Sequence, residues 1–182
     1  MATKDYAKII ASSTLNDLIY NGPARPPVYG SIINTFAYGA WSASVNITYR
    51  FGYYFYRNSI QYGTASGLGG HSDYSLRWQK PGDEIGTSVP SVPIVGNAAR
   101  DEFYKYSNVL VESGDHIRLQ DINVSYELPL KKMAPNPIKR LQVYGYVSNL
   151  GIIWQKSKSK IDPDYQLTKA PMMVAFGFRT DL

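Results

Sequence analysis

The stretch WSASVNITYRFGYYFY, residues 41–56, constrains the fold of this chain more than any other feature. Its odd-numbered positions are apolar or aromatic throughout, and its even-numbered positions are polar up to Arg50. Successive side chains of a β-strand point to opposite faces, so the alternation predicts one long strand with an apolar and a polar face. Asn46 and Arg50 lie on the polar face. Ordinary strands have about 5–6 residues, so this length needs an explanation.

The same alternation predicts four further strands. Residues 28–38 precede the long strand, and Gly39 with Ala40 forms the two-residue turn of a hairpin. Residues 122–128 and 141–148 follow, and residues 174–182 end the chain. The last of these strands places Arg179 and Asp181 together on its polar face.

A break in phase precedes the strand at 122–128. The apolar residues Ile117 and Leu119 are one position out of step with Ile122 and Val124. One extra residue restores the phase, so we expect a β-bulge near Gln120. The alternative is that an outer extension changes there into the main part of the strand.

Short and long connections alternate along the chain. The hairpin turn and residues 129–138 are short and polar, whereas residues 57–108 and 151–171 are long. Residues 57–108 show few regular patterns and are predicted to be one structureless loop, a feature that is usually functional in a folded protein.

The length of the strand suits a membrane. Twelve steps from Trp41 to Tyr53 span about 40 Å at about 3.3 Å per residue. A tilt near 45° reduces this to about 28 Å, close to the ~25 Å apolar band of outer-membrane barrels, which have short periplasmic turns and long extracellular loops. The strand order then returns the C-terminus to the periplasmic side. A long amphipathic strand in a soluble β-sandwich or barrel is the alternative.

Five strands cannot close such a barrel, since single-chain bacterial barrels begin at about 8 strands. Open sheet edges are not tolerated in lipid. We therefore expect an all-β fold, an antiparallel transmembrane β-barrel segment with long extracellular loops, that belongs to a larger barrel. Its water-filled lumen would be faced by Asn46, Arg50, Arg179 and Asp181.

Composition excludes other classes. The sequence contains no run of about 18 apolar residues and no signal-peptide pattern, and it has no cysteine. The net charge of +5 comes from scattered residues, whereas nucleic-acid binders gather theirs into a stripe, so no nucleic-acid partner is expected.

Several blocks together resemble the C-terminal end of SusC/RagA-type TonB-dependent outer-membrane transporters. The blocks W-x-x-P-G-D, beginning at Trp78, and G-D-x-I-R-L-x-D-I, beginning at Gly114, are the most specific. The others are RPPVYGSIINTFAYGAWSASVNITYRFGYYF (25–55), VYGYVSNLGIIW (143–154), IDPDY (161–165) and the final strand. They cover about the last 150 residues.

The resemblance implies that residues 1–182 are the C-terminal part of a 22-stranded barrel whose plug domain is absent from this chain. It implies TonB-powered import of glycans or oligopeptides across the outer membrane of a Gram-negative bacterium. The implied partners are TonB, through the absent plug region, a SusD-like surface lipoprotein and outer-membrane lipid. The terminal Leu182 departs from the aromatic residue usual in the family.

No catalytic pattern is present, so no enzyme and no cofactor are expected. His71 and His116 lack the spacing of a zinc site. Asp162 and Asp164 have oxygen ligands of the kind that calcium binds, but an Asp-Pro turn explains them better. The cluster of Lys131, Lys132, Lys139 and Arg140 is interpreted as a solvated turn.

Aromatic residues in or beside the long loops are the candidate contacts for substrate or for the lipoprotein lid, because aromatic faces stack on sugars and anchor interfaces. Packing within the loops is the alternative for each. They are Tyr74, Trp78, Tyr104, Tyr106 and Trp154.

Two other functions stay open. A soluble β-rich carbohydrate-binding module would use the same aromatics. A truncated, non-functional transporter remnant would share every sequence feature of the working transporter.

Overall fold

The computed structural model describes residues 4–63, 71–130, 138–159 and 161–181. The chain forms two compact units. The loop unit consists of Met1–Gly22 and Tyr54–Glu112, and the sheet unit consists of Pro23–Tyr53 and Ser113–Leu182. No helix in the described ranges is long and apolar enough to span a membrane.

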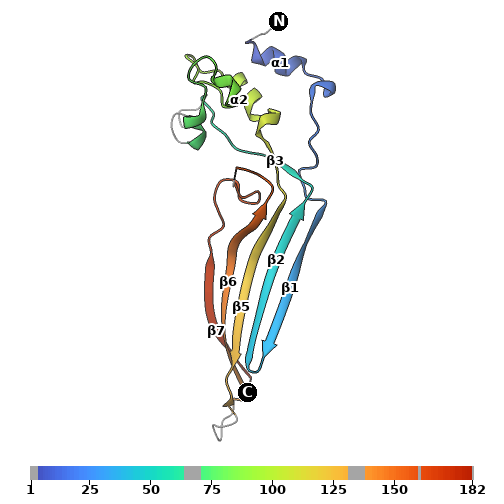
Figure 1. Cartoon of the computed structure of the whole chain (residues 1–182), viewed down its shortest axis with the longest axis vertical. Coiled ribbons are helices and arrows are strands. Elements are labelled where there is room, and N and C mark those ends of the chain that lie inside the picture. Colours follow the sequence, from blue (N-terminus) through green and yellow to red (C-terminus); the bar gives the residue numbers. More distant parts are fainter. Residues whose placement is uncertain (1–3, 64–70, 131–137, 160, 182) are drawn as a thin grey trace. The chain divides into compact units, whose positions relative to one another are not determined.

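The sheet unit is an antiparallel sheet of five strands in the order β1-β2-β5-β6-β7, each strand paired with its neighbour (Figure 1). The strands are β1 (Val28–Tyr38), β2 (Trp41–Phe51), β5 (His116–Glu127), β6 (Arg140–Gln155) and β7 (Met173–Asp181). The predicted all-β, antiparallel character and the five strands are confirmed. The sheet is open in this chain, with β1 and β7 at its edges.

The register of the strands places apolar side chains opposite apolar ones, and polar side chains opposite polar ones, across the sheet. Opposite residues of paired strands lie on the same face. Tyr38 is opposite Trp41, Trp41 is opposite Tyr126, and Tyr126 is opposite Val143, which is opposite Phe178. This set lies on the apolar face. On the polar face, Ser44 is opposite Asn123, and Asn123 is opposite Tyr146.

The predicted bulge is confirmed at Gln120. Asn46 pairs with Asp121 and Ile47 pairs with Leu119, so Gln120 is the extra residue. The insertion returns Leu119 to the same face as Ile122, as the phase break required.

The prediction of one strand over residues 41–56 is wrong, because β2 ends at Phe51. Gly52 has a φ of 80°, a left-handed conformation that favours glycine. Its N–H donates to the Asp115 carboxylate at 2.6 Å. The chain resumes as β3 (Tyr54–Tyr56), which pairs with β4 (Val111–Ser113) in a separate two-stranded sheet. The sequence pattern does not reveal this break, because Gly52 occupies an even position and the apolar residues continue at the odd positions on both sides of it.

The loop at residues 57–108 is not structureless, contrary to the prediction. Among its described residues, the loop unit contains the α-helices α1 (Tyr6–Ser12) and α2 (Ala98–Lys105) and the 3₁₀ turns η1 (Leu15–Asp17), η3 (Ser72–Leu76), η4 (Asp83–Ile85) and η5 (Asn108–Leu110). Asn97 caps α2 by accepting from the Arg100 N–H at 3.0 Å. Ile60, Tyr62 and Val89 form a small buried core, with Tyr74 packed against it. Elements this short lack a detectable apolar period.

The second long loop is shorter than predicted, because β6 continues to Gln155. The strand passes Asn149 and Gly151, both with positive φ, where its register against β5 shifts. The connection to β7 is therefore residues 156–172. Most of the turn at 129–138, with Lys131 and Lys132, lies outside the described residues. Lys139 precedes β6, and Arg140 forms an ion pair with Glu127 at 2.8 Å.

Candidate functional site

The four residues predicted to lie on a polar face share one face of the sheet. Asn46 and Arg50 alternate with the apolar residues of β2, and Arg179 is opposite Gln142 on the neighbouring strand. Asp181 lies two positions beyond Arg179 on β7 and so points the same way. This face brings together polar side chains from all five strands.

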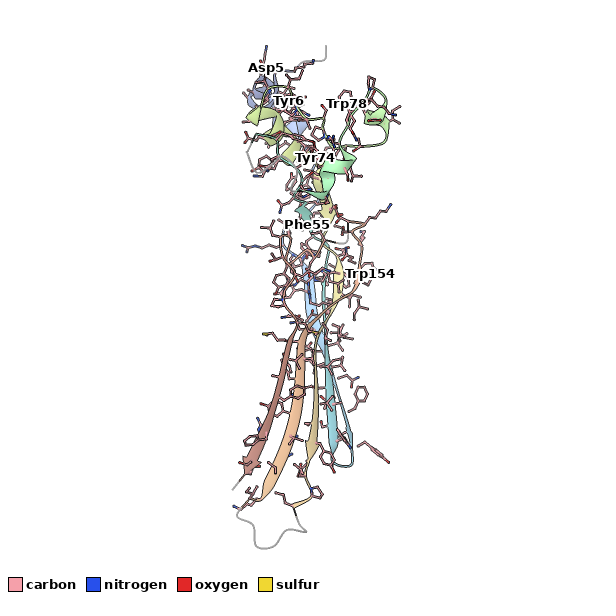
Figure 2. The ribbon with its side chains drawn as sticks, turned by 90° about the vertical axis from the view of Figure 1, so that its left-hand side faces the viewer. Asp5, Tyr6, Phe55, Tyr74, Trp78 and Trp154 are labelled. Atoms are coloured by element: carbon pink, nitrogen blue, oxygen red, sulfur yellow. The ribbon has the colours of Figure 1, made fainter. Side chains whose placement is uncertain are left out.

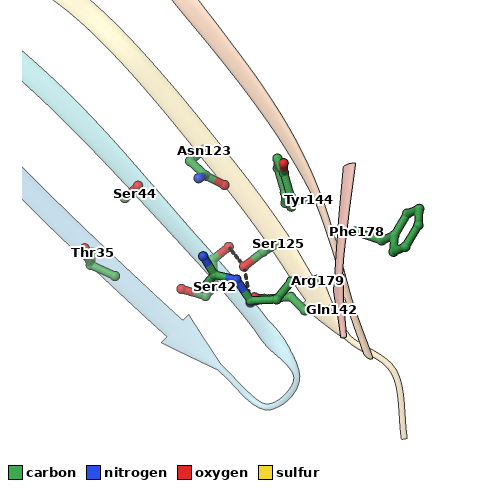
Figure 3. A pocket seen from close by; sticks show the side chains of 9 residues that line it. All are labelled: Thr35, Ser42, Ser44, Asn123, Ser125, Gln142, Tyr144, Phe178 and Arg179. Carbon is green, nitrogen blue, oxygen red and sulfur yellow. Dashed lines mark hydrogen bonds between the residues drawn. The ribbon is translucent and has the colours of Figure 1, made fainter. Parts of the chain in front are cut away.

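One part of the polar face is a shallow depression lined by hydroxyl and amide groups (Figure 3). Gln142 Nε2 donates to Ser125 Oγ at 2.9 Å, and Ser125 Oγ donates to the Ser42 carbonyl at 3.5 Å. Further lining residues are Thr35, Ser44, Asn123, Tyr144 and Arg179, with Phe178 at the β7 edge. The lining presents mainly neutral donors and acceptors, together with one charged group, the Arg179 guanidinium.

Elsewhere on the polar face, two carboxylates of the β6–β7 connection meet cationic groups of β2 and β5. Arg50 Nη1 lies 2.6 Å from Asp164 Oδ1, and Arg118 Nη2 lies 2.6 Å from Asp162 Oδ1 and 3.4 Å from Asp164 Oδ2. His116 Nε2 lies 3.3 Å from Asp164 Oδ2. Arg118 and His116 are only 4 % and 1 % exposed. We call these five residues the Arg–Asp cluster.

Neighbouring groups orient His116. Its Nδ1 lies 2.8 Å from the Gly114 carbonyl oxygen and 3.4 Å from the Tyr53 hydroxyl. A carbonyl oxygen only accepts, so Nδ1 is the donor in that contact. The other ring nitrogen, Nε2, faces Asp164 Oδ2 at 3.3 Å.

Burial and charge shift two pKa values here. Burial acts to raise the pKa of the Asp164 carboxyl, but the hydrogen bond and charge of His116 together with the Arg50 and Arg118 charges outweigh it and lower that pKa. Burial raises the pKa of the Tyr53 hydroxyl, and the Asp164 charge adds to this effect. Asp164 is therefore ionised and Tyr53 is neutral at neutral pH.

The two aspartates have arginine partners, which supports the turn interpretation over calcium. The Asp164 N–H donates to Asp162 Oδ1 at 3.0 Å, closing a local Asx-type turn. Within the described ranges, no group of three or more His, Cys, Asp or Glu side chains is placed to hold a metal ion. The two histidines lie in different units, and His71 Nδ1 accepts from the Asp73 N–H at 3.1 Å.

Four of the five candidate aromatics lie in the loop unit, where Figure 2 labels Tyr74 and Trp78. Tyr74 lies under the Arg77 guanidinium, 3.9 Å from its ring centroid, and Trp78 Nε1 donates to the Lys80 carbonyl. Tyr104 is buried, and its hydroxyl lies 3.0 Å from Ser59 Oγ, which suits the packing alternative. Trp78 and Tyr106 are exposed and remain available for contacts.

Trp154 is separate from this group. It lies on β6 opposite Ile117, and therefore on the apolar face of the sheet. Its ring packs edge-on against Phe51, with centroids 6.3 Å apart. Trp154 was expected beside the long loop, but β6 continues to Gln155 and includes it.

Sequence reasoning missed His116 and Arg118 as site residues. Both lie in the block beginning at Gly114, and Asp162 and Asp164 lie in the IDPDY block, so the sequence shows the two halves of the cluster as separate blocks. The hydrogen bond between Arg118 and Asp162 joins positions that are 44 residues apart in the sequence. It depends on how the β6–β7 connection folds, which neither block encodes alone.

Protein-family models and curated proteins give no match to the sequence. Solved structures do. A structure of the RagAB peptide importer in the 'open-open' state aligns with a TM-score of 0.66 and 18 % identity, covering 94 % of this chain and 19 % of that chain.

Two related structures agree. One of the RagAB peptide transporter has a TM-score of 0.60, 20 % identity, and coverage of 84 % and 16 % of the two chains. One of the importer in the 'closed-closed' state has a TM-score of 0.57, 21 % identity, and coverage of 79 % and 16 %. The chain spans less than a fifth of those proteins. The chain therefore has the fold of part of the RagAB importer, which confirms the resemblance to SusC/RagA-type transporters at the level of fold.

Proposed function

We propose that this chain forms part of the wall of a TonB-dependent outer-membrane importer of the SusC/RagA type, with oligopeptides as cargo. The observation that carries the proposal is a five-stranded sheet with an uncovered apolar face and a polar, ion-paired opposite face, in the fold of a peptide importer. The cargo class is the one carried by those similar proteins, which are a peptide importer and a peptide transporter.

The apolar face requires a non-aqueous neighbour. Phe176 is 84 % exposed, Phe178 is 74 % exposed and Trp41 is 56 % exposed. Burying one such side chain stabilises a protein by roughly 1.5–3 kcal/mol. Among the described residues of the sheet unit, Tyr53 and Pro163 are the only buried apolar side chains. Such a sheet is unfavourable in water, which argues against the soluble carbohydrate-binding alternative.

Aromatic residues at both ends of the apolar face fit two membrane interfaces. Trp41 and Tyr126 pair at one end with centroids 4.7 Å apart. Phe51 packs against Tyr49 and Trp154 at the other end. Ten steps of β2 span roughly 33 Å, and a 45° tilt gives about 23 Å, close to the ~25 Å band of these barrels. The shorter strand fits this band better than the predicted one.

In this proposal the polar face lines the transport path, with Asn46, Arg50, Arg179 and Asp181 facing water. Strands β1 and β7 pair with strands from the rest of the barrel, since open edges are unfavourable in lipid. TonB acts through a region outside this chain.

The loop unit would contact a SusD-like lipoprotein. Its groove between α1, η1 and α2 is lined by exposed apolar side chains. They include Leu15, Leu18, Ile19, Tyr20 and Tyr106. Trp78 is the remaining exposed aromatic candidate for contact with cargo or lid.

Cysteine labelling tests the orientation of the sheet. The chain has no cysteine, so Ser44→Cys and Val45→Cys introduce single thiols at adjacent positions on opposite faces of β2. In the whole protein in outer membranes, a charged maleimide should label Ser44→Cys, and only a lipid-soluble maleimide should label Val45→Cys. Equal labelling of both by the charged reagent would overturn the proposal. Uptake of a labelled oligopeptide tests the cargo.

A further inference from the structure

The Arg–Asp cluster consists of a rigid part and a tethered part. Arg50 and Arg118 project from paired strands of the sheet. Asp162 and Asp164 lie on residues 161–172, a segment without helix or strand that we call the strap. Asn149 Nδ2, which donates to the Pro171 carbonyl at 3.0 Å, holds the far end of the strap to β6. The cationic groups therefore have positions fixed by the sheet, whereas the carboxylates have positions fixed by the strap.

The cationic part has the geometry of an anion site. Arg118 Nη2 contacts both carboxylates, Arg50 reaches Asp164 from the neighbouring strand, and His116 Nε2 approaches the second oxygen of Asp164. Donors from three side chains thus surround one carboxylate. Charge-assisted hydrogen bonds of this kind are about twice as strong as neutral ones.

The buried Arg118 guanidinium requires an anion at all times. Arg118 is 4 % exposed, and leaving a buried charge without its partner costs roughly 3–5 kcal/mol. Tyr165 adds its ring face, 5.5 Å from the Arg118 guanidinium, but a ring does not replace a full negative charge. If the strap leaves the sheet, another anion is therefore favoured in its place.

The other charged and titratable groups around the cluster do not supply that anion. Tyr53 is neutral, as its raised pKa requires. Asp115 accepts from the Gly52 N–H and lies 3.6 Å from Lys156 Nζ, so it is already engaged at the end of β2. The strap aspartates are thus the counter-ions of Arg50 and Arg118, and His116 lies beside Asp164.

We propose that Arg50, His116 and Arg118 form a binding site for carboxylate-bearing solutes, and that Asp162 and Asp164 of the strap occupy it in the resting protein. The solute exchanges with the strap carboxylates on the polar face. With oligopeptide cargo, an inference that rests on the proposed function, the ligand is an acidic side chain or the C-terminal carboxylate.

Emptying the site by mutation tests this. In the whole protein in detergent at low ionic strength, Asp162→Asn with Asp164→Asn removes the resident charges and nearly preserves their volume. Fluorescently labelled triglutamate should bind this double variant at least tenfold more tightly than the wild type, measured by anisotropy. Equally labelled triglutamine amide is the matched probe without carboxylates, and its affinity should not change.

Arg50→Gln in the double variant is the control for the site itself. Arg50 is half-exposed, so its loss is compatible with folding, and it should reverse most of the gain. If the double variant does not assemble, Asp164→Asn alone should give a smaller gain of the same selectivity. An unchanged affinity, an equal gain for the amide probe, or a gain that survives Arg50→Gln would each overturn the proposal. Peptide uptake is measured separately, so a failure of the transport function is distinguishable from a failure of this site.

Discussion

The two units are stabilised in opposite ways. The loop unit has a small apolar core, capped helices and a partly buried ion pair of 2.6 Å between Arg57 and Asp73. The sheet unit has long paired strands and a buried polar cluster, and it exposes its apolar side chains. The loop unit is thus stabilised by its own internal contacts, whereas the stability of the sheet unit depends on what covers its apolar side chains. Substitutions confined to one unit test whether its stability comes from its own core or from its surroundings.

The largest effect is expected in the core of the loop unit. Leu110 is 1 % exposed, and Leu110→Ala should cost about 2–5 kcal/mol because it leaves a cavity. Hydrogen exchange followed by mass spectrometry should show faster exchange over residues 98–110 and unchanged exchange in β5 and β6. Val109→Ala, at an exposed neighbour, is the control. Equal acceleration in both units would show that they unfold together.

A charge on the apolar face is the corresponding test of the sheet unit. Val45 lies near the middle of β2, opposite Ile122. Val45→Arg should destabilise the whole protein in lipid by about 2–4 kcal/mol, the cost of arginine at the centre of a barrel wall. Ser44→Arg, on the polar face, should cost much less. Urea unfolding in lipid vesicles measures both, and equal costs would contradict the assigned faces.

The end of β2 offers a smaller effect. Gly52→Ala places a side chain at a φ of 80° and its Cβ 3.0 Å from Pro27 Cγ. Such a backbone conformation costs a non-glycine residue roughly 1–2 kcal/mol. Gly39→Ala is a useful comparison, because its φ is also positive while no atom lies within 4 Å. Urea unfolding of the whole protein should rank Gly52→Ala as the more destabilising change.

Acid should loosen the strap locally. The pKa of Asp164 is lowered in the folded protein, so its contribution to stability is complete above the ordinary value near 4 and is lost as the pH falls through the lowered pKa. Exchange measurements over residues 161–172 should therefore show no added opening between pH 7 and 5, after correction for intrinsic rates. Opening should appear below about pH 4. In Asp164→Asn this pH dependence should be much weaker.

The smallest effect is expected at the exposed ion pair of Arg140 and Glu127. Both side chains are about half-exposed, and such pairs contribute about 0–1 kcal/mol. Arg140→Ala should therefore leave urea unfolding nearly unchanged, even at low salt. A loss above about 2 kcal/mol would show that this end of the sheet is not in contact with water.

Much of the sheet could be predicted because strand alternation is a local property. Residues 28–38 matched β1, and the bulge at Gln120 followed from one break in phase. The end of β2 escaped detection because glycine at position 52 breaks no alternation while its backbone turns. The loop unit escaped because its helices are short and its polar contacts join distant positions, such as Arg57 to Asp73.

The sequence by itself determined which side chains share a face, because the period of two in a strand follows from backbone geometry. The sequence also showed the resemblance to SusC/RagA-type transporters, which the structural comparison confirmed at the level of fold. Only the tertiary structure decided which charges meet. Arg118 and Asp162 approach to 2.6 Å because the β6–β7 connection folds over the polar face. That pairing depends on the path of a connection without regular structure, which has no periodicity to reveal it.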